Sequence, residues 1–87
     1  MTYTILLHPK AAKALNKTNE KTRITSKLKQ LKNTPEKAGK RLKHCEYYSL
    51  RIGDYRAIYE IDPNQKQVTI LYIGHRKNVY DDFTKIF

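Results

Sequence analysis

Hydrophobic and polar residues alternate around a single glycine in the second half of the chain, which is typical of a β-hairpin. Residues 47–59 read YYSLRIGDYRAIY, with Gly53-Asp54 between two runs rich in aromatic, β-branched and aliphatic residues. Glycine at the first loop position suits a two-residue type II′ turn. Counting outward from that turn predicts the cross-strand pairs Ile52–Tyr55, Arg51–Arg56, Leu50–Ala57, Ser49–Ile58 and Tyr48–Tyr59.

The two faces of this hairpin differ in character. Period-two alternation places one set of side chains towards the core, namely Tyr48, Leu50, Ile52, Tyr55, Ala57, Tyr59 and Ile61. The opposite face carries Ser49, Arg51 and Arg56, with the two guanidinium groups directly across the ladder. Directly opposed like charges destabilise a sheet. The pair therefore predicts a bound anion, such as a phosphate, between the two arginines.

The N-terminal half predicts one strand and two helices. Thr2 to Leu7 is short and rich in β-prone residues, and the proline that follows suits the first turn of a helix from Pro9 to about Lys17. Asn19 can cap a second helix over residues 20–33, in which isoleucine and leucine recur at positions i, i+4 and i+7. Lysines occupy the other side of this helix.

The remaining segments complete a single domain over residues 1–87. Residues 37–44, KAGKRLKH, are predicted to form a basic loop with Leu42 tucked inward. The continuous apolar run from Gln67 to Gly74 indicates a central strand, and Val79 to Phe87 has the spacing of a short amphipathic helix. The predicted fold is α+β, in the order β-α-α-β-β-β with a short C-terminal helix. It has a mostly antiparallel four-stranded sheet with two helices on one face.

Charge is spread unevenly along the chain. There are 18 Lys and Arg residues against 8 Asp and Glu, a net charge of +10. The whole excess lies between Pro9 and Lys43, whereas half of the later basic residues are arginines: Arg51, Arg56 and Arg76. Lysine supplies a diffuse field, and the arginine fork matches phosphate oxygens. The pattern predicts helices that steer an anionic partner and a sheet that binds it.

The cysteine content and the N-terminal residues indicate in which cellular compartment the protein functions. Cys45 is the single cysteine, so no intrachain disulfide or cysteine-based zinc cluster is expected. The start, MTYTILLHPK, has the features of neither a secretion signal nor a membrane span. These observations predict a cytoplasmic protein without a membrane partner.

The end of the last predicted strand carries the strongest candidate chemistry. Gly74-His75-Arg76-Lys77 places an imidazole and two cations where a rigid scaffold commonly presents reactive groups. The acids are scattered and the histidines lack ligand spacing, so we expect no metal and no other cofactor. A nucleophilic pair of Cys45 with a histidine stays open, although it lacks an oxyanion-hole signature. Metal-free cleavage of RNA fits better, because the 2′-hydroxyl is an internal nucleophile.

Two motifs carry a family resemblance. They are Y48-S-L-R-I-G-D-Y-R-A-I-Y59 and I70-L-Y-I-G-H-R-K-N-V-Y80, preceded by L42-K-H and an ALxxL-type first helix. Together they resemble the RelE/ParE toxin superfamily, and specifically its RelE branch, over nearly the whole chain. The resemblance implies a fold similar to microbial ribonucleases and cleavage of mRNA in the ribosomal A site, giving a cyclic phosphate and a 5′-hydroxyl end. It also implies a cognate acidic antitoxin, similar to RelB, that wraps the toxin.

The resemblance assigns roles residue by residue. Arg56 resembles the family arginine that contacts the scissile phosphate, and Arg76 the one that stabilises developing charge. Tyr80 matches a tyrosine that orients or stacks on the substrate. Arg51 falls near a basic residue that other members use for proton abstraction or charge stabilisation.

The identity of the general base stays open. Ser49 departs from the family pattern, since some members carry a lysine there, and His75 is the obvious substitute because imidazole exchanges protons near neutral pH. The predicted catalytic residues are therefore Arg51, Arg56, His75, Arg76 and Tyr80. The predicted RNA-binding residues are Lys40, Arg41, Lys43, Ser49 and Lys77.

Simpler interpretations stand beside these. The arginine pair could be solvated strand residues paired with Glu46 or Glu60. His75 could be a strand-end histidine bonded to backbone, and Tyr80 could anchor the terminal helix through Arg76. Two other functions also fit the scaffold: a ParE-like inhibitor that binds DNA gyrase without chemistry, and a non-toxic RNA-binding protein.

Overall fold

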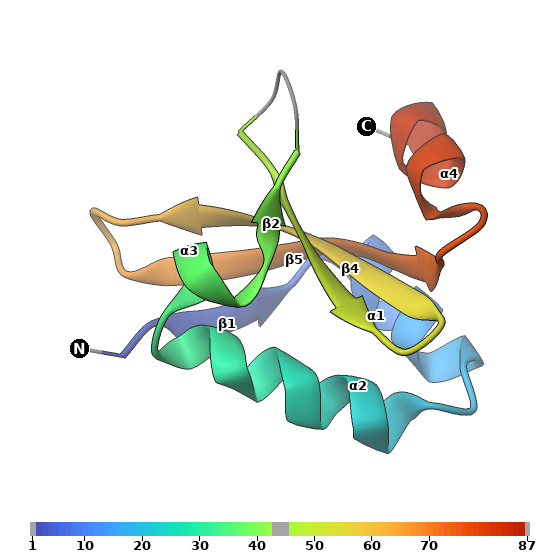
Figure 1. Ribbon diagram of the computed structural model, residues 1–87, viewed down its shortest axis with the longest axis horizontal. Helices are drawn as coiled ribbons and strands as arrows, with labels where there is room; N and C mark the ends of the chain where they lie inside the picture. The colour runs from blue at the N-terminus through green and yellow to red at the C-terminus, as the bar shows by residue number, and fades with distance from the viewer. Residues whose placement is uncertain (1, 43–45, 87) are drawn as a thin grey trace.

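The protein folds around one five-stranded sheet in the order β1-β5-β4-β3-β2 (Figure 1). The computed structural model describes residues 2–42 and 46–86. Its strands are β1 (Thr4–Leu7), β2 (Lys40–Arg41), β3 (Tyr48–Ile52), β4 (Tyr55–Asp62) and β5 (Gln67–His75). β1 runs parallel to β5, and the other neighbours are antiparallel. The predicted α+β class is confirmed, with five strands in place of four.

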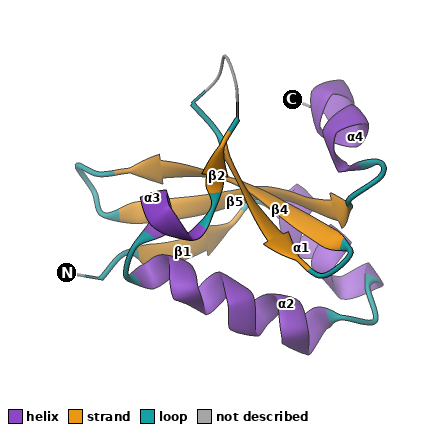
Figure 2. Ribbon diagram, in the orientation of Figure 1, coloured by secondary structure: helices purple, strands orange, loops and turns teal. Residues whose placement is uncertain are grey.

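Helices cover both faces of the sheet (Figure 2). They are α1 (Pro9–Lys17), α2 (Lys21–Leu28), the 3₁₀ turn η1 (Lys29–Lys32), α3 (Pro35–Ala38) and α4 (Val79–Ile86). As predicted, α1 and α2 pack against one face. The C-terminal helix α4, for which the sequence predicted no particular face, packs against the other. In the described ranges, no helix is long and apolar enough to span a membrane.

The fifth strand comes from the segment predicted to be a loop. β2 has only two residues, which pair with Ser49 and Tyr48 of β3. Gly39, just before it, has no room for a side chain: a Cβ there would meet the Tyr59 hydroxyl and lie 2.8 Å from the Ser49 carbonyl oxygen. Two exposed basic residues on a sheet edge lack the alternation that marks a half-buried strand, so the sequence signal was absent.

The second helix begins and ends differently from the prediction. Glu20, not Asn19, is the N-cap residue, and it makes no side-chain capping bond. The Thr18 hydroxyl instead accepts a hydrogen bond from the Glu20 N–H at 3.1 Å. After Leu28 the chain tightens into η1, which ends at Lys32. The predicted Asn19 cap was therefore wrong by one position.

The central hairpin has the predicted register. Strands β3 and β4 pair from Ile52–Tyr55 at the turn to Tyr48–Tyr59 at the far end, with Arg51 directly opposite Arg56. Gly53 has a φ of 57°, the positive value that a type II′ turn requires at its first loop position. Its missing side chain also makes room for the Arg23 guanidinium, which would lie 2.9 Å from a Cβ.

Two hydrophobic cores lie on opposite sides of the sheet. The larger one, under α1 and α2, contains Ala11, Leu15, Ile24, Leu28, Leu31, Leu50, Ile52, Ala57, Tyr59, Val68, Ile70 and Ile73. The smaller one, under α4, contains Ile58, Leu71, Val79 and Phe83. Leu42 is partly buried against this second core, so it points inward as predicted.

A bulge at Leu71 interrupts the central strand. Ile58 pairs with Tyr72 and Tyr59 pairs with Ile70, which leaves Leu71 as an extra residue. Leu71 and Tyr72 both contact the core under α4. A bulge of this kind reverses the alternation of side chains beyond it. The last residues of β5 therefore face the side opposite to the one that simple counting from Ile70 predicts.

Tyr59 ties α3 to the sheet. Its buried hydroxyl donates a 2.7 Å hydrogen bond to the Pro35 carbonyl oxygen, and its ring stacks on Tyr48 at 5.5 Å between centroids. Burial raises the pKa of Tyr59 to about 12, although a hydrogen bond from the Gly39 backbone opposes this shift. One phenol thus connects a one-turn helix, the edge strand and the main core.

Tyr59→Phe should lower the free energy of unfolding by about 1–3 kcal/mol, because the buried Pro35 carbonyl loses its donor. Urea unfolding of the wild type and the variant measures this. Tyr48→Phe is the matched control, since its phenol is only partly buried, and it should change stability by less than about 0.5 kcal/mol. Equal losses in the two variants would contradict the role of the Tyr59 hydroxyl.

Tyr59 should also make stability fall in alkali. Its pKa is about 12 in the folded protein against 10.0 as the ordinary value, so the unfolded chain loses this proton first. The stabilising contribution is complete below pH 10 and is lost as pH rises towards 12, by at most roughly 3 kcal/mol. Unfolding free energies of wild type and Tyr59→Phe, subtracted at each pH, cancel the other tyrosines and lysines. A difference between the two proteins that stays constant with pH would contradict the raised pKa of Tyr59.

Candidate functional site

The hairpin brings two arginines together on the α4 side of the sheet. Arg51 and Arg56 are direct cross-strand partners, one pair outward from the turn. In a two-residue hairpin this second pair is not hydrogen-bonded, so the Cα atoms approach to about 4.5 Å and the side chains lie close. Arg51 is exposed and Arg56 is partly buried. The predicted pairing of the two arginine positions across the ladder is present.

Tyr80 of α4 links Arg56 to Ser49. Arg56 Nη1 donates to the Tyr80 hydroxyl at 3.5 Å, and its guanidinium carbon lies 6.0 Å from the ring centroid. The Tyr80 hydroxyl donates to Ser49 Oγ at 3.2 Å. Ser49 is only 4% exposed, so the oxygen that accepts the Tyr80 hydrogen bond is buried against the sheet. The sequence predicted these residues separately but gave no signal that they form one chain of contacts.

Arg76 lies beside the hairpin turn. Its backbone N–H donates to the Asp54 carbonyl oxygen at 2.7 Å, and its Nε lies 3.9 Å from Asp54 Oδ1. The two side chains are 49% and 72% exposed, so this ion pair contributes little to stability. Arg76 therefore stands at the end of the sheet where Arg51 and Arg56 lie. Arg76 thus pairs with Asp54, whereas Tyr80 contacts Arg56.

His75 is placed on the opposite face from the arginine pair. It is the cross-strand partner of Tyr55, and the two rings meet edge to face at 5.8 Å. Arg56 instead faces Gly74, because the bulge reverses the alternation of β5. His75 Nδ1 accepts the Lys77 N–H at 3.2 Å, which leaves the proton of a neutral ring on Nε2. The imidazole thus has the backbone-bonded geometry of a strand-end histidine.

The predicted RNA-binding residues are divided between the two faces. Lys40 pairs with Ser49 and so shares the arginine side, and Lys77 is exposed in the turn after β5. Arg41 pairs with Tyr48 on the other side. Lys43 lies outside the described residues.

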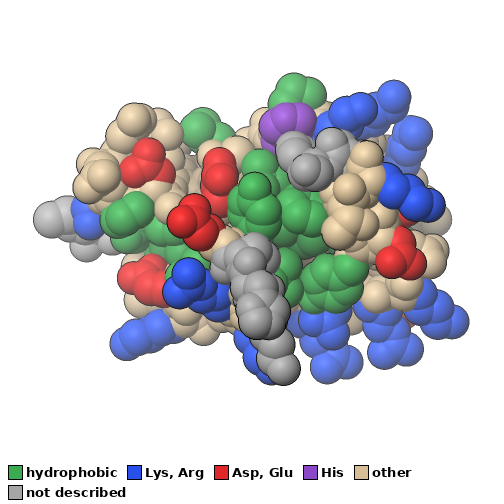
Figure 3. Space-filling model, turned by 90° about the horizontal axis from the view of Figure 1, so that it is seen from above, with side chains coloured by type: hydrophobic (Ala, Val, Ile, Leu, Met, Phe, Trp, Pro, Cys, Tyr) green, Lys and Arg blue, Asp and Glu red, His purple; other side chains and the backbone are tan. Residues whose placement is uncertain are grey.

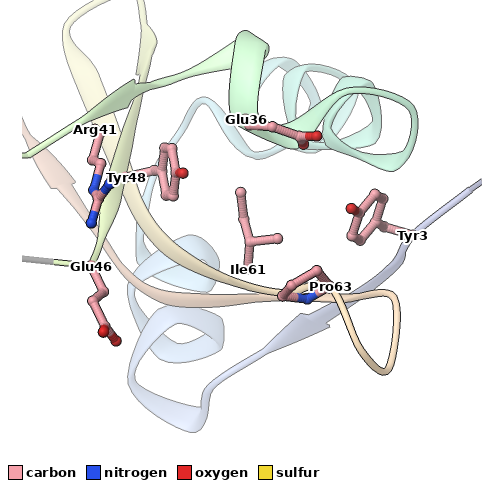
Figure 4. Close-up of a pocket in the computed structure, with 7 residues that line it drawn as sticks. All are labelled: Tyr3, Glu36, Arg41, Glu46, Tyr48, Ile61 and Pro63. Carbon is pink, nitrogen blue, oxygen red and sulfur yellow. The ribbon is translucent and has the colours of Figure 1, made fainter.

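Arg41 lines a separate hollow of about 420 Å³ at the far end of the hairpin (Figure 4). The other lining residues are Tyr3, Glu36, Glu46, Tyr48, Ile61 and Pro63. Glu46 thus lies by this hollow, and Glu60 is exposed opposite Thr69. Throughout residues 2–42 and 46–86, no carboxylate lies within ion-pair distance of the arginine pair. The alternative in which these acids neutralise the pair finds no support.

Seen from the α4 side, the molecule carries acidic side chains within the left half of the view and basic side chains mainly towards its edges (Figure 3). Hydrophobic side chains occupy the middle of this view, and Lys and Arg side chains gather along its lower and right-hand edges. Among the described residues, no group of three His, Cys, Asp or Glu side chains is placed to hold a metal ion. The basic side chains thus lie mainly at the margins of this face.

Known structures share this fold. A chain of the toxin–antitoxin complex RelBE2 from Mycobacterium tuberculosis is 28% identical, with a TM-score of 0.78 over 87% of this chain and 93% of that one. A mutant E. coli toxin RelE in the free state is 22% identical, with a TM-score of 0.79 over 100% and 99%. The chromosomal ParDE system of P. aeruginosa gives 16% identity and a TM-score of 0.73 over 85% and 96%. At these lower identities the likeness shows the fold alone.

The sequence itself identifies the family. No curated protein matches the chain. Residues 5–80 match the family described as the ParE toxin of type II toxin-antitoxin system, parDE. This match includes the hairpin, both motifs and Tyr80. The chain therefore belongs to the ParE toxin family of type II toxin–antitoxin systems, within the RelE/ParE superfamily.

Proposed function

We propose that this toxin cleaves messenger RNA on the ribosome without a metal ion. The observation that carries the proposal is the directly opposed pair Arg51 and Arg56, which has no carboxylate partner within residues 2–42 and 46–86. Two like charges at this range destabilise a sheet, and a phosphate between them replaces repulsion with two attractive contacts. The guanidinium fork matches phosphate oxygens in geometry as well as charge.

The proposed reaction uses the 2′-hydroxyl of the RNA. Its oxygen attacks the adjacent phosphorus while the bond from phosphorus to the 5′-oxygen breaks, leaving a 2′,3′-cyclic phosphate and a 5′-hydroxyl end. The 2′-hydroxyl loses one proton and the 5′-oxygen gains one, so no further reactant is consumed. Arg51 and Arg56 bind the non-bridging oxygens and stabilise the negative charge that builds on them.

Tyr80 and Arg76 complete the proposed site. The Arg56–Tyr80 hydrogen bond is long at 3.5 Å, so a phosphate oxygen can replace it at little energetic cost. Arg76 is held by an exposed ion pair that contributes little, and it can turn from Asp54 to the substrate. Ser49 keeps Tyr80 in position during this exchange.

In this proposal His75 contributes less to the cleavage rate than the arginines do. Imidazole suits proton exchange near neutral pH, but the ring faces away from Arg56 and its Nδ1 already accepts the Lys77 N–H. To act as the base, the ring must turn about the end of β5. We therefore assign most of the rate enhancement to alignment and charge stabilisation by the arginines.

The net charge of +10 suits two anionic partners. One is the ribosomal A site, towards which the lysine-rich helices steer the toxin. The other is a cognate acidic antitoxin similar to RelB, which inhibits by covering the positive surface. Lys40 and Lys77 add to that surface on either side of the arginine pair.

Inhibition of DNA gyrase by binding alone is the second candidate function. It is favoured by the match of residues 5–80 to a family named for the ParE toxin. A gyrase inhibitor requires a complementary surface but no chemistry at the arginine pair. The two functions therefore differ in their dependence on Arg56 and Arg76.

Inducible expression followed by primer extension on a translated message separates these functions. We expect cuts within codons that occur only while the message is translated. Arg56→Ala and Arg76→Ala should each relieve growth arrest and remove the cuts while the protein stays soluble, because each removes a phosphate contact. Lys27→Ala on α2 is the control. Intact message together with arrested replication would identify gyrase inhibition instead.

Arg51→Gln should reduce cleavage without reducing stability. Losing one charge-stabilising contact lowers the cleavage rate about 100- to 1,000-fold, whereas removing one of two opposed charges leaves the free energy of unfolding unchanged or raises it by up to about 1 kcal/mol. Cleavage in a reconstituted translation reaction and urea unfolding measure the two effects. Lys27→Gln makes the same charge change and should affect neither. Lost stability in Arg51→Gln would argue for a structural role.

A further inference from the structure

A basic hollow lies at the free edge of β5. It has a volume of about 210 Å³ and is lined by Lys10, Lys13, Ala14, Lys17 and Tyr72. The lysines recur at positions i, i+3 and i+7 of α1, so they project from one side of that helix. No carboxylate is among the lining residues. The hollow therefore combines three ammonium groups with one aromatic ring.

The chain path explains why α1 reaches this edge. β1 ends at Leu7, which is paired with Ile70, so the last part of β5 has no strand on that side. α1 begins at Pro9 and packs beside β5 in its place. The bulge at Leu71 then turns Tyr72 towards the α4 side of the sheet, where its ring meets the lysines of α1.

The hollow adjoins the arginine pair. Tyr72 and Gly74 are two residues apart beyond the bulge and share a face, about 7 Å apart along the strand. Gly74 is the cross-strand partner of Arg56, and a Cβ on Gly74 would lie 3.2 Å from Tyr72 Cε2. The Tyr72 ring thus borders the position that faces Arg56. Val79 of α4 borders the same position, since its Cγ2 would also lie 3.2 Å from that Cβ, so a strand bound at Arg56 must pass over Val79 to reach the lysines.

The chemistry of the hollow suits a nucleotide. Burial raises the pKa of Tyr72, and the Asp82 carboxylate adds to the rise, so the ring is an uncharged stacking surface at neutral pH. Every base has a face that stacks on such a ring, and lysines track the adjacent phosphates. A hollow of about 210 Å³ is too small for a helix, which is about 10–12 Å across with its side chains. An acidic helix would have to lie over it rather than in it.

We propose that this hollow binds the single RNA strand next to the cleaved phosphate, with a base against Tyr72 and a phosphate among Lys10, Lys13 and Lys17. This rests on the proposed function and adds a second subsite to it. The strand would cross from the arginine pair on β3 and β4, over Val79, to α1. An acidic peptide is the competing occupant.

Binding of a non-cleavable, 2′-O-methylated single-stranded RNA tests the subsite independently of cleavage. The triple variant Lys10→Gln, Lys13→Gln, Lys17→Gln should weaken binding at least tenfold and reduce the slope of log affinity against log salt by about 0.7, the contribution of one phosphate contact. The matched control Lys27→Gln, Lys29→Gln, Lys32→Gln makes the same charge change on α2 and η1. It should leave the slope unchanged.

Tyr72 provides a second readout. Tyr72→Phe keeps the stacking surface and should bind RNA like the wild type, whereas Tyr72→Leu should lose roughly tenfold in affinity. Urea midpoints of both variants establish that they are folded. Equal effects of the two triple variants would overturn the subsite, leaving only diffuse attraction.

The remaining outcomes separate this subsite from the proposed function. If the α1 variant loses affinity for a polyglutamate peptide but not for RNA, the hollow is an acidic-protein site and the inference is wrong. If Arg51→Gln binds RNA normally while the α1 variant does not, the subsite stands and the assignment of the arginine pair fails. If the wild type binds no free RNA, the subsite inference is wrong, whereas the proposed function is decided separately by cleavage of translated messages.

Discussion

The two-residue turn at Gly53 is the constraint on which the rest of the structure depends. Side chains in a strand alternate with a period of two, so a slip of one residue would move every side chain to the other face. With the turn in place, Tyr59 enters the main core and Ser49, Arg51 and Arg56 share the α4 side. The repulsion between the arginines is a cost that the hairpin carries because the two cores on either side of it fix its register.

The two faces of the sheet differ in role: one holds the main core and the other carries the candidate site. The side under α1 and α2 holds most of the buried apolar residues and supplies the stability of the domain. The side under α4 has a smaller core and carries Ser49, Arg51 and Arg56 beside it. Helix α4 contributes to both, because it covers the small core and carries Tyr80, whose hydroxyl contacts Arg56 and Ser49. The candidate site is therefore assembled by packing between elements distant in sequence.

Local signals were sufficient for much of this structure. The register of the hairpin followed from one glycine, and α1 from a proline and an apolar stripe. The edge strand β2 was missed because its pairing is decided by β3 and not by its own two residues. The Tyr80–Ser49 contact spans 31 positions, and no periodicity encodes it. The arginine pair was foreseen because its partners are adjacent through a tight turn, whereas the placement of His75 depended on an unforeseen bulge.

That bulge has a consequence for comparing related chains. The letters GHR after an apolar strand do not by themselves determine whether the histidine lies on the same face as the arginine pair. One additional residue inside β5 decides whether Gly74 or Ile73 lies across from Arg56, and therefore which face of the sheet His75 occupies. Homologues that align perfectly at this motif can thus display different chemistry if one has a regular strand and the other an interrupted one. Sequences of this family should therefore be aligned by their cross-strand pairs between β4 and β5 rather than by the GHR motif.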